Sequence, residues 1–543
     1  MKTILLLTGF LCFSIYPFAQ TGTINRPNDP VVLTGAQLSA FSGLQPDEIV
    51  GFQFKNNSWI QIPIQVDERA LLDIVTPYGA LAASSGFPPS PSNPKVTFYC
   101  DATTETGSDP DPNFDSDDEL VFMAKDCGAE SDGSVPNGVI ANTCQALIIT
   151  DPLGGSGYVY LYQNDGSLQQ DAGISYVTLN SNLASTSGFP TNASGTNHEN
   201  TTITTAKYFW HYDSEWVSDV FKIILGNNVD ILDRYKSFFA DGNCQRHEDA
   251  FSEGENAFVT VRSGPIRIIR SFMGAMSGPL TNRTHIFYEG RQDIYTDLRV
   301  HHIPSIYDAF DYNSNADGMT YYNELNLNGV IIDGSQDTVN HGDIQWEFIT
   351  GTQGSISILQ RRTTSIVPPN DGSFTSYYDD DSVNPASNCT GDGQAWGTSG
   401  VGVIFGTDIH TDIMAIDTHY RTLQNKRIVY VDDANLTYDK ATTYNEQYKH
   451  PLVVEVRDCE TLDVGENEQL QELKLYPNPN KGMLSIETNQ AYTLRIYNTM
   501  GQNIGVFAIN AGHNHINITQ KGCYYLQFTD YHQAIIYKKL IVD

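Results

Sequence analysis

The sequence predicts a mostly β, multi-domain protein built from β-sandwiches, with few helices and a small C-terminal β-sandwich. Strand-length runs rich in Tyr, Thr, Val and Ile recur along the chain, such as GYVYLYQ and GVGVIFGTD, and Gly and Asn separate them. Helical periodicity is scarce, and its best candidate, residues 216–239, is interrupted by Gly226-Asn227-Asn228. At 543 residues the chain is long enough for several domains.

The first twenty residues predict a secretory signal peptide. One Lys precedes an apolar run from Ile4 to Phe18, which ends in Ala19-Gln20. The run is short for a transmembrane helix, and no later segment reaches the length needed to span a bilayer. We therefore expect cleavage near Gln20 and a protein that is secreted or held at the cell surface, without a transmembrane segment.

The charge balance restricts the partners. The chain has 64 acidic and 31 basic residues, a formal net charge of −33. Such a charge argues against nucleic acid or anionic lipid as partners. It also supplies many carboxylates for divalent cations. A polyanionic substrate would need a local basic cluster or bound Ca²⁺ to overcome the repulsion.

Composition shifts divide the chain into five expected segments. The linker is the stretch DVGENEQLQE, which is polar, acidic and free of aromatic residues. The segments are a signal peptide at 1–20, an N-terminal β-domain with an acidic loop at 21–165, a central β-sandwich catalytic or binding domain at 166–460, the linker at 461–472 and the small C-terminal β-sandwich at 473–543.

The last seventy or so residues carry a series of ordered motifs. They are the Tyr476-Pro477-Asn478-Pro479 turn, Gly482, the strand Leu494 to Tyr497, Met500-Gly501, the Gly522 to Tyr524 step and the closing Lys538-Lys539-Leu540 strand. In this order they resemble the C-terminal type IX secretion sorting domain of Bacteroidetes proteins, although Cys523 departs from the usual small or polar residue. The resemblance implies recognition by the type IX secretion machinery and passage across the outer membrane, followed by release or surface anchoring.

An acidic loop in the N-terminal domain predicts a cation site. The run GSDPDPNFDSDDELVFMAKDCG places six acidic residues within positions 109–119: Asp109, Asp111, Asp115, Asp117, Asp118 and Glu119. Ca²⁺ takes six to eight oxygen ligands, which closely spaced carboxylates can supply. The spacing is not that of an EF-hand. We expect Ca²⁺ with Asp111, Asp115 and Asp117 as ligands; the alternative is a solvated acidic turn before the strand LVFMA.

The cysteine count indicates structural disulfides. In an exported chain pairing is expected, but the odd number leaves at least one thiol unpaired within the chain. Cys100, Cys127 and Cys144 lie close enough in sequence for one local bridge. The sequence has no CxxC motif that would suggest a zinc or haem site. The seven cysteines after cleavage are Cys100, Cys127, Cys144, Cys244, Cys389, Cys459 and Cys523.

The stretch HIFYEGRQDIYTDLRVHHIP, residues 285–304, concentrates imidazoles, guanidiniums and phenols in an acidic chain. Read as a strand, it alternates between two faces. We expect Ile294, Thr296, Leu298 and Val300 to point inward. The opposite face would then present Tyr295, Asp297, Arg299 and His301.

These residue types suit β-elimination at a uronic acid. A guanidinium neutralises the carboxylate, a His or Tyr removes the C5 proton, and a Tyr protonates the departing oxygen. The constellation is similar in kind to that of β-sandwich polysaccharide lyases, although no family motif matches position by position. The expected catalytic residues are His285 or His301 as base, Tyr288 or Tyr295 as acid, and Arg299 for the uronate. The expected substrate-binding residues are Trp210, His211, Trp216, Arg283 and Tyr312.

Two other functions stay open for an extracellular polysaccharide partner. A glycoside hydrolase would use two carboxylates, either Asp213 with Glu215 or Asp308 with Asp311. A non-catalytic surface adhesin or carbohydrate-binding protein would need only the exposed aromatic residues. Alternating Arg and Asp on a strand also form ordinary cross-strand ion pairs. The sequence has no GxSxG, HExxH, Walker-type or GxGxxG motif to support serine hydrolase, zinc protease or nucleotide chemistry.

Overall fold

A computed structural model of the chain describes residues 22–79, 82, 90–182, 199–239, 246–254, 256–275, 278–299, 304–366, 371–386, 390–405, 422–459, 473–498, 502–518, 520–530 and 535–543. Two compact units divide the chain, Met1–Glu460 and Thr461–Asp543. Strands dominate both, so the predicted mostly β, multi-domain architecture is confirmed. The predicted signal peptide and linker lie outside the described residues.

The N-terminal part of the first unit is a small β-sandwich. Two antiparallel sheets pack their apolar faces together, with residues such as Leu33, Leu120, Ile149 and Leu161 in the shared core. One sheet has the order β1 (Pro30–Thr34), β7 (Glu119–Met123), β4 (Gln65–Asp67). The other has the order β27 (Val453–Asp458), β8 (Gln145–Thr150), β9 (Ser156–Gln163), β2 (Ile49–Lys55), β3 (Ser58–Ile62). A separate ribbon pairs β5 (Arg69–Asp73) with β6 (Lys95–Tyr99).

The edge strand β27 shows that the chain returns to its N-terminal sheet after the central domain. β27 pairs with β8 from Val453 opposite Thr150 to Asp458 opposite Gln145. A disulfide joins Cys144 to Cys459 at the end of this pairing. The expected local bridge is absent among the described cysteines, because Cys100 and Cys127 are both free.

The central part is a larger sandwich around a nine-stranded antiparallel sheet. Its order is β15 (Ala257–Ser263), β16 (Ile268–Met273), β17 (Asn282–Phe287), β18 (Arg291–Arg299), β26 (Thr422–Asp432), β23 (Gly354–Thr364), β22 (Trp346–Gly351), β20 (Thr320–Asn323), β21 (Asn326–Ile331). Two four-stranded sheets cover its inner face. They are β10 (Val177–Ser181), β11 (Thr201–Thr205), β12 (Tyr208–Tyr212), β13 (Ser218–Ile223) and β14 (Leu232–Phe239), β19 (Ser305–Tyr312), β25 (Thr398–Ile404), β24 (Ser373–Asp379).

The best helical candidate of the sequence forms two strands of different sheets instead. Residues 216–239 contain β13 and β14, joined by a turn in which Asn228 has a φ of 59°. The side chain of Asp230 accepts hydrogen bonds from the backbone N–H groups of Phe221 and Leu232, at 2.9 and 3.2 Å. The Gly-Asn-Asn interruption and these side-chain hydrogen bonds favour a turn here over the helix that the apolar spacing predicts.

Helices are short in the described chain. The α-helices are α2 (Glu248–Glu253) and α3 (Asp439–Lys449), and the 3₁₀ turns are η1 (Gly35–Phe41), η2 (Pro46–Glu48), η3 (Thr76–Tyr78), η4 (Ala124–Asp126) and η6 (Ser314–Ala316). Among the residues that the structure describes, none of these combines the length and the apolar character needed to span a bilayer.

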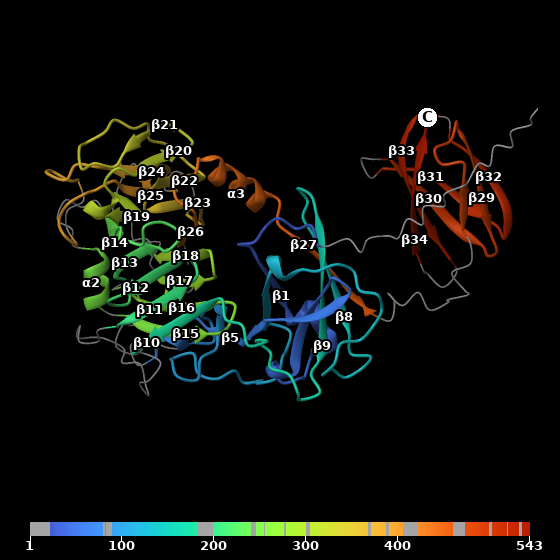
Figure 1. Cartoon of the computed structure of the whole chain (residues 1–543), viewed down its shortest axis with the longest axis horizontal. Coiled ribbons are helices and arrows are strands. Elements are labelled where there is room, and N and C mark those ends of the chain that lie inside the picture. The colour runs from blue at the N-terminus through green and yellow to red at the C-terminus, as the bar shows by residue number, and fades with distance from the viewer. Residues whose placement is uncertain are drawn as a thin grey trace, which may run out of the picture. The chain divides into compact units, whose positions relative to one another are not determined.

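Two elements cover the outer face of the nine-stranded sheet. Val121 and Met123 of β7 pack on Ile269 of β16 and Ile286 of β17. Over the other half of the same face, α3 packs against β22, β23 and β26, and the rings of Tyr444 and Tyr430 stack 3.8 Å apart. Figure 1 shows α3 above the central strands, with β1, β8, β9 and β27 grouped in the other half of the unit. The strip over β18 and β26 lies between these two coverings.

The second unit is a small β-sandwich. One sheet has the order β28 (Lys474–Tyr476), β29 (Met483–Thr488), β32 (Gly512–Asn517), and the other β31 (Asn503–Ile509), β30 (Tyr492–Asn498), β33 (Gly522–Thr529), β34 (Ile535–Val542). Leu484, Ile496 and Leu526 belong to its core. The YPNP turn is tied to the last strand, because Asn478 donates to the Lys539 carbonyl at 2.7 Å and accepts from the Ile541 N–H at 2.9 Å.

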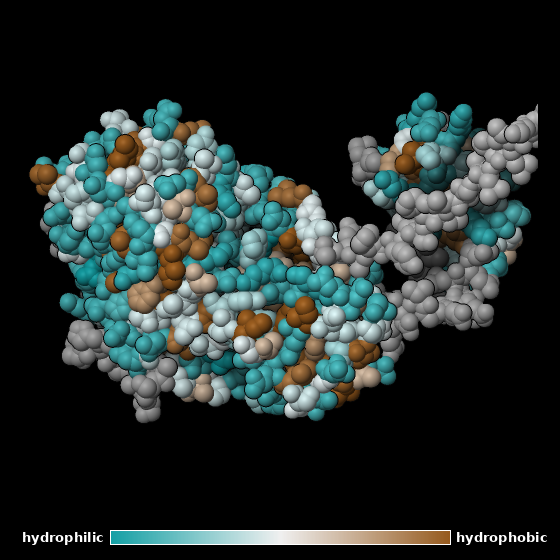
Figure 2. All heavy atoms as spheres, viewed as in Figure 1, coloured by the Kyte–Doolittle hydropathy of each residue, from teal (hydrophilic) through white to brown (hydrophobic). Residues whose placement is uncertain are grey.

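The surface of the first unit is consistent with an acidic exported protein. Hydrophilic residues cover most of its visible face, and the hydrophobic patches there are small and separated (Figure 2). Scattered exposed apolar residues of this kind are normal for folded proteins.

Candidate functional site

A polar cleft of about 550 Å³ opens over the uncovered strip of the nine-stranded sheet. Strands β18 and β26 form its floor, the N-terminal sandwich forms one wall, and the end of α3 with the segment before β27 forms the other. Its lining includes four basic, three acidic and five tyrosine residues: Arg26, Arg267, Arg291, Lys426, Asp29, Glu119, Asp293, Tyr99, Tyr288, Tyr295, Tyr430 and Tyr448.

The alternation of β18 directs its polar residues toward this cleft. Ile294 and Thr296 are buried on the inner face, whereas Tyr295 is 36% exposed and lines the cleft with Asp293. The predicted alternation holds for Ile294, Tyr295, Thr296 and Leu298, whereas Arg299 is buried and Val300 and His301 lie outside the described residues. Tyr295 and Asp293 are joined by a hydrogen bond from the phenol to Oδ2 at 3.4 Å.

Strand register brings a lysine from a distant segment beside Tyr295. β18 pairs with β26 so that Lys426 stands directly opposite Tyr295. The ammonium lies 4.7 Å from the centroid of the Tyr295 ring and 3.7 Å from Asp293 Oδ2. A cation over an aromatic ring is held by the quadrupole of the ring. Lys426 is thus positioned at the cleft floor with only one long charge contact in the described structure.

Arg291 forms the second cationic position. Its Nε and Nη2 bind Asp293 at 2.6 and 2.9 Å, and Nη1 donates to Asp29 Oδ1 at 2.9 Å and to the Tyr430 hydroxyl at 3.2 Å. The register places Tyr430 directly opposite Arg291. Because Asp29 precedes β1, this ion pair also ties the N-terminal sandwich to the central sheet.

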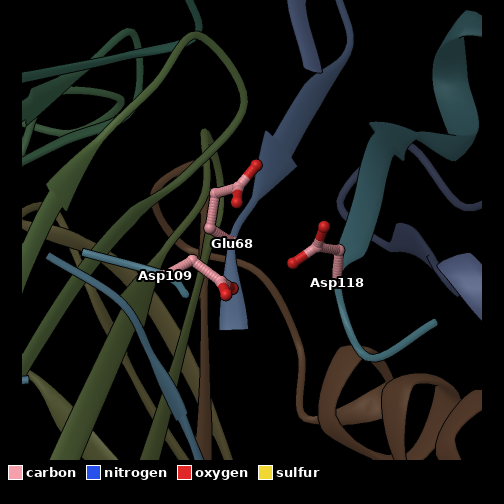
Figure 3. A group of neighbouring side chains, drawn as sticks. All are labelled: Glu68, Asp109 and Asp118. Carbon is pink, nitrogen blue, oxygen red and sulfur yellow. The ribbon is translucent and has the colours of Figure 1, made fainter. Parts of the chain in front are cut away.

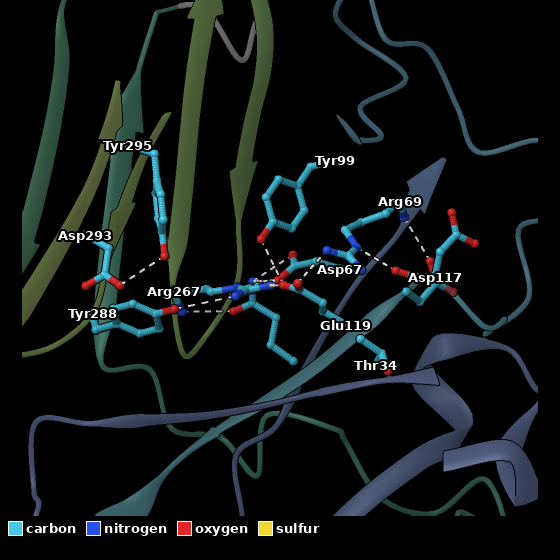
Figure 4. Close-up of polar contacts among 12 residues, drawn as sticks. Thr34, Asp67, Arg69, Tyr99, Asp117, Glu119, Arg267, Tyr288, Asp293 and Tyr295 are labelled. Carbon is cyan, nitrogen blue, oxygen red and sulfur yellow. Dashed lines mark hydrogen bonds and ion pairs between the residues drawn. The ribbon is translucent and has the colours of Figure 1, made fainter. Parts of the chain in front are cut away.

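Arg267 forms the third cationic position, at the wall of the cleft (Figure 4). It is buried, and its guanidinium pairs with Asp67 at 2.8 Å and Glu119 at 2.6 Å. Tyr99 donates to Glu119 at 2.8 Å, and Arg267 Nη1 lies 3.5 Å from the Tyr288 hydroxyl. Charge-assisted contacts from one guanidinium to two carboxylates give a defined geometry.

The electrostatics keep the carboxylates charged and the phenols neutral. Burial opposes ionisation of Asp293, but Arg291 and Lys426 outweigh it, and the pKa of Asp293 lies below its usual value. Burial likewise opposes ionisation of Glu119, while Arg267 and Arg69 hold its pKa low. Burial raises the pKa of Tyr288 to about 12, against the opposing effect of Arg267. Burial and the Asp293 charge raise the pKa of Tyr295.

The structure separates the predicted catalytic residues. Tyr288 and Tyr295 line the cleft. His285 lies on the opposite face of the sheet, 1% exposed, where its Nδ1 is 3.0 Å from both the Tyr212 hydroxyl and Gln292 Nε2. Its pKa is well below the usual value because of burial and then of Arg270 and Arg283. His285 therefore has the environment of a core residue, with neutral imidazole.

Of the other two predicted catalytic residues, Arg299 is not among the residues that line the cleft. Arg299 is buried at the end of β18, where its backbone N–H donates to Thr281 at 3.1 Å. His301 lies outside the described residues. The single surface expected to carry Tyr295, Arg299 and His301 together is not seen in the described part of the strand.

Most of the predicted substrate-binding residues belong to the sandwich core. Trp210, Trp216, Arg283 and Tyr312 are each at most 1% exposed. The Trp216 ring lies 4.7 Å from the Arg283 guanidinium, which also pairs with Asp308 at 2.9 Å. His211 is half-buried on β12, and its Nδ1 lies 2.5 Å from Asp219. Packing and internal pairing account for these side chains, and none lines the cleft.

The carboxylate pairs expected for a hydrolase are also outside the cleft. Glu215 and Asp311 are fully buried, and Asp311 pairs with Lys236 at 2.5 Å. Asp308 is buried in its ion pair with Arg283, and only Asp213 is exposed. The cleft carboxylates, Asp29, Glu119 and Asp293, each pair with an arginine, and the pKa values of Glu119 and Asp293 lie below their usual values. That state does not suit a general acid.

The acidic loop brings together a different set of carboxylates from the predicted one. Asp111 is exposed and its Oδ1 accepts from the Asn113 N–H at 3.2 Å, while Asp115 Oδ1 accepts from the Asp117 N–H at 3.0 Å. These are turn contacts. The group whose oxygens converge is Glu68, Asp109 and Asp118.

Sequence reasoning missed several cleft residues: Arg267, Arg291, Lys426, Tyr99 and Tyr430. The segment NKRIVYVDD of β26 does alternate, which places Lys426, Ile428 and Tyr430 on one face. That alternation is the signal that could have found Lys426 and Tyr430. It does not show that their face meets β18 and the N-terminal sandwich.

Comparisons with known proteins identify the tail. Residues 474–543 match the family described as "Secretion system C-terminal sorting domain", which confirms the resemblance to the type IX sorting domain. The protein is therefore a secreted or cell-surface protein that uses the type IX machinery. A search of curated proteins found no match.

Two solved structures show remote likeness. One is "Crystal Structure Analysis of HI1317", at 8% identity and a TM-score of 0.25, covering 43% of this chain and 93% of that one. The other is "Polysaccharide Lyase BACCELL_00875", at 6% identity and a TM-score of 0.21, covering 63% of this chain and 47% of that one. At these TM-scores neither likeness identifies the fold or the activity of the chain.

Proposed function

We propose that this secreted or cell-surface protein binds an acidic, uronate-containing extracellular polysaccharide in the cleft over β18 and β26. The observation that carries the proposal is the local reversal of charge. The whole chain has about two acidic residues for each basic one, 64 against 31, whereas four basic and three acidic residues line the cleft. Two further carboxylates, Asp151 and Asp67, pair with arginines of the lining from outside it, so the reversal concerns the side chains that line the cleft.

Lys426 is the best-placed receptor for a sugar carboxylate. The three arginines of the lining each have a carboxylate partner within 2.9 Å, but the shortest ion pair of Lys426 is 3.7 Å. Burial lowers the pKa of Lys426, and the nearby Asp293 opposes that effect. A ligand carboxylate would complete the charge pairing of this ammonium without breaking an existing short ion pair.

The tyrosines supply the apolar and hydrogen-bonding surface that sugars need. Tyr295 is the exposed ring of the floor, and Tyr430 and Tyr448 lie beside it in the lining. Burial and then the Asp293 charge raise the pKa of Tyr295, so its phenol stays protonated. Flat apolar faces with a polar edge fit pyranose rings and their hydroxyl groups.

A polysaccharide lyase is the second candidate, because a neutral phenol, an ammonium and a cleft meet at Tyr295. In a β-elimination Lys426 would neutralise the uronate and Tyr295 would protonate the departing oxygen. The reaction also needs a base. The lining residues include no histidine, and the cleft carboxylates are engaged by arginine. The binding function needs no such group, and for that reason it ranks first.

The test is titration calorimetry of the protein with a panel of polyuronates and a neutral glucan. Lys426→Gln is expected to weaken polyuronate binding about 10-fold, which corresponds to the roughly 1.5 kcal/mol of a hydrogen bond to a charged group. Tyr295→Ala is expected to weaken binding by a similar factor. The matched controls, Lys95→Gln and Tyr525→Ala, replace exposed residues outside the cleft and should bind as the wild type does.

The same samples distinguish binding from catalysis. Ultraviolet absorbance of an unsaturated product identifies a lyase, new reducing ends without that absorbance identify a hydrolase, and binding without new ends supports the first proposal. Absence of polyuronate binding in the wild type, or unchanged binding in both cleft variants, would overturn the assignment of the cleft.

A further inference from the structure

Three carboxylates from separate segments converge behind the wall of the cleft. Glu68 lies between β4 and β5, Asp109 belongs to the acidic loop, and Asp118 immediately precedes β7. One oxygen of each lies within 4.8 Å of the others. Figure 3 shows the three side chains on three stretches of chain, with Asp109 and Asp118 directing their carboxylates toward each other. Ligands on opposite sides of Ca²⁺ stand about 4.6–5.2 Å apart, so the spacing matches its coordination sphere.

Three carboxylate oxygens of this group are buried and lack hydrogen-bond partners among the described residues. Neither carboxylate oxygen of Glu68, nor Oδ2 of Asp109, has a hydrogen-bond partner among the described residues, although all three atoms are buried. Arg69 and Arg267 pair with Glu119. Arg262 lowers the pKa of Glu68, but burial, Asp118 and Asp109 have larger effects in the opposite direction. A buried carboxylate without a counter-charge is costly, and bound metal is one of the ways in which proteins satisfy it.

The third ligand is held in place before any ion arrives. Asp118 is fully buried, and its two oxygens accept hydrogen bonds from the backbone N–H groups of Arg69 and Asp115, each at 2.9 Å. Each carboxylate oxygen has a further lone pair for coordination. The site therefore combines one fixed carboxylate with both oxygens of Glu68 and Oδ2 of Asp109, while Asp109 Oδ1 accepts from the Asp111 N–H at 2.9 Å.

From this geometry we infer that Glu68, Asp109 and Asp118 bind a Ca²⁺ ion. All three ligands are oxygens, which a hard cation prefers, and water or loop carbonyls would fill the remaining positions. A soft or borderline metal such as Zn²⁺ is therefore disfavoured.

In the absence of an ion, protons are the competing occupants. Burial and then Asp118 raise the pKa of Glu68 to about 7, and burial raises the pKa of Asp118 to about 6. Metal binding requires deprotonated carboxylates, so Ca²⁺ uptake at neutral pH would release protons.

The ion would also support the cleft. Arg69 and Glu119 directly follow two of the ligands in sequence and pair with each other at 2.6 Å, and Glu119 holds Arg267 at the cleft wall. Calcium binding should therefore strengthen glycan binding. This consequence rests on the proposed function, whereas the ion site does not.

The test is calorimetric titration of the chelator-treated full chain with Ca²⁺, Mg²⁺ and Zn²⁺ at neutral pH. One Ca²⁺ per chain is expected, with a rise in melting temperature. Glu68→Gln should weaken binding at least 10-fold and remove the thermal shift. Because Glu68 makes no side-chain hydrogen bond in the described structure, this variant should fold, and its ion-free form should melt no lower than the ion-free wild type.

The control Asp111→Asn replaces an exposed aspartate of the same loop and should bind Ca²⁺ as the wild type does. No Ca²⁺ uptake by the wild type, equal uptake by Glu68→Gln, or a preference for Zn²⁺ would overturn the inference. Glycan titration with and without chelator is a separate readout. If Ca²⁺ binds but glycan affinity does not change, only the link to the cleft fails.

Discussion

Replacing Arg267 with methionine is the sharpest test of how the cleft wall is built. The guanidinium is 1% exposed and bridges two carboxylates, Asp67 at 2.8 Å and Glu119 at 2.6 Å. Arg267→Met keeps most of the side-chain volume and removes the charge. It leaves Asp67 buried without its cation, because the other hydrogen bonds of that carboxylate among the described residues come from the neutral amide of Gln65.

Removing one partner of a buried ion pair costs about 3–5 kcal/mol, because the other charge stays buried and unpaired. For a unit as large as Met1–Glu460, an unfolding entropy of about 2.1 cal/mol/K per residue gives close to 1 kcal/mol per degree. The expected fall in melting temperature at pH 7 is therefore about 3–5 °C.

The loss should depend on pH. The pKa of Glu119 is lowered in the folded protein from its usual 4.5, so its pairing stabilises the fold above that pH and is lost as the pH falls through the folded value. The gap between the variant and the wild type should therefore narrow in acid.

The assay is thermal and urea unfolding of both proteins at pH 7 and pH 4, with Arg457→Met as control. Arg457 is an exposed arginine that pairs with Glu455 at 2.7 Å on β27, and such surface pairs contribute under about 1 kcal/mol. If Arg267→Met were no less stable than Arg457→Met at pH 7, the account of the cleft wall would be wrong.

Three further outcomes follow from the fold. Burial raises the pKa of Glu215 to about 8, so its ionisation opposes folding increasingly between pH 4.5 and 8. The melting temperature of Glu215→Gln relative to that of the wild type should therefore rise over this pH interval. Cys144→Ser removes the bond to Cys459 and should cost about 2–5 kcal/mol in non-reducing denaturation, with no difference from wild type once both are reduced. Leu494→Ala empties a fully buried position of the tail and should lower the stability of the tail transition by about 2–5 kcal/mol, leaving the first unit unchanged in calorimetry.

Local patterns predicted the elements of the fold well. The alternation of residues 291–299 depends on a period of two, and the structure has Ile294 buried and Tyr295 exposed. The tail was equally well predicted, because its motifs recur in order along the sequence, although the contacts of Asn478 with the closing strand are long-range. The segment 216–239 misled the prediction because apolar spacing alone does not show the Asp230 contacts that form the turn.

The candidate site depended on long-range packing, which the sequence pattern does not contain. Both faces of the nine-stranded sheet are largely covered. Alternation therefore could not show whether the face that carries His285 or the face that carries Tyr295 would reach solvent. Lys426 meets Tyr295 only through the β18–β26 register. Buried arginines also contradict a simple rule of polar residues outside: Arg270 and Arg283 lie in the core because Glu199 and Asp308 pair with them there.

The most direct test of the cleft assignment compares one polyuronate with its carboxyl-reduced form. Calorimetry of the wild type should give binding of the polyuronate that is about 10-fold tighter than binding of the reduced polymer, because only the former offers a carboxylate to Lys426. In Lys426→Gln the two affinities should become similar. Equal affinity of the wild type for both polymers, or an undiminished preference in Lys426→Gln, would contradict the proposal that this cleft recognises an acidic glycan.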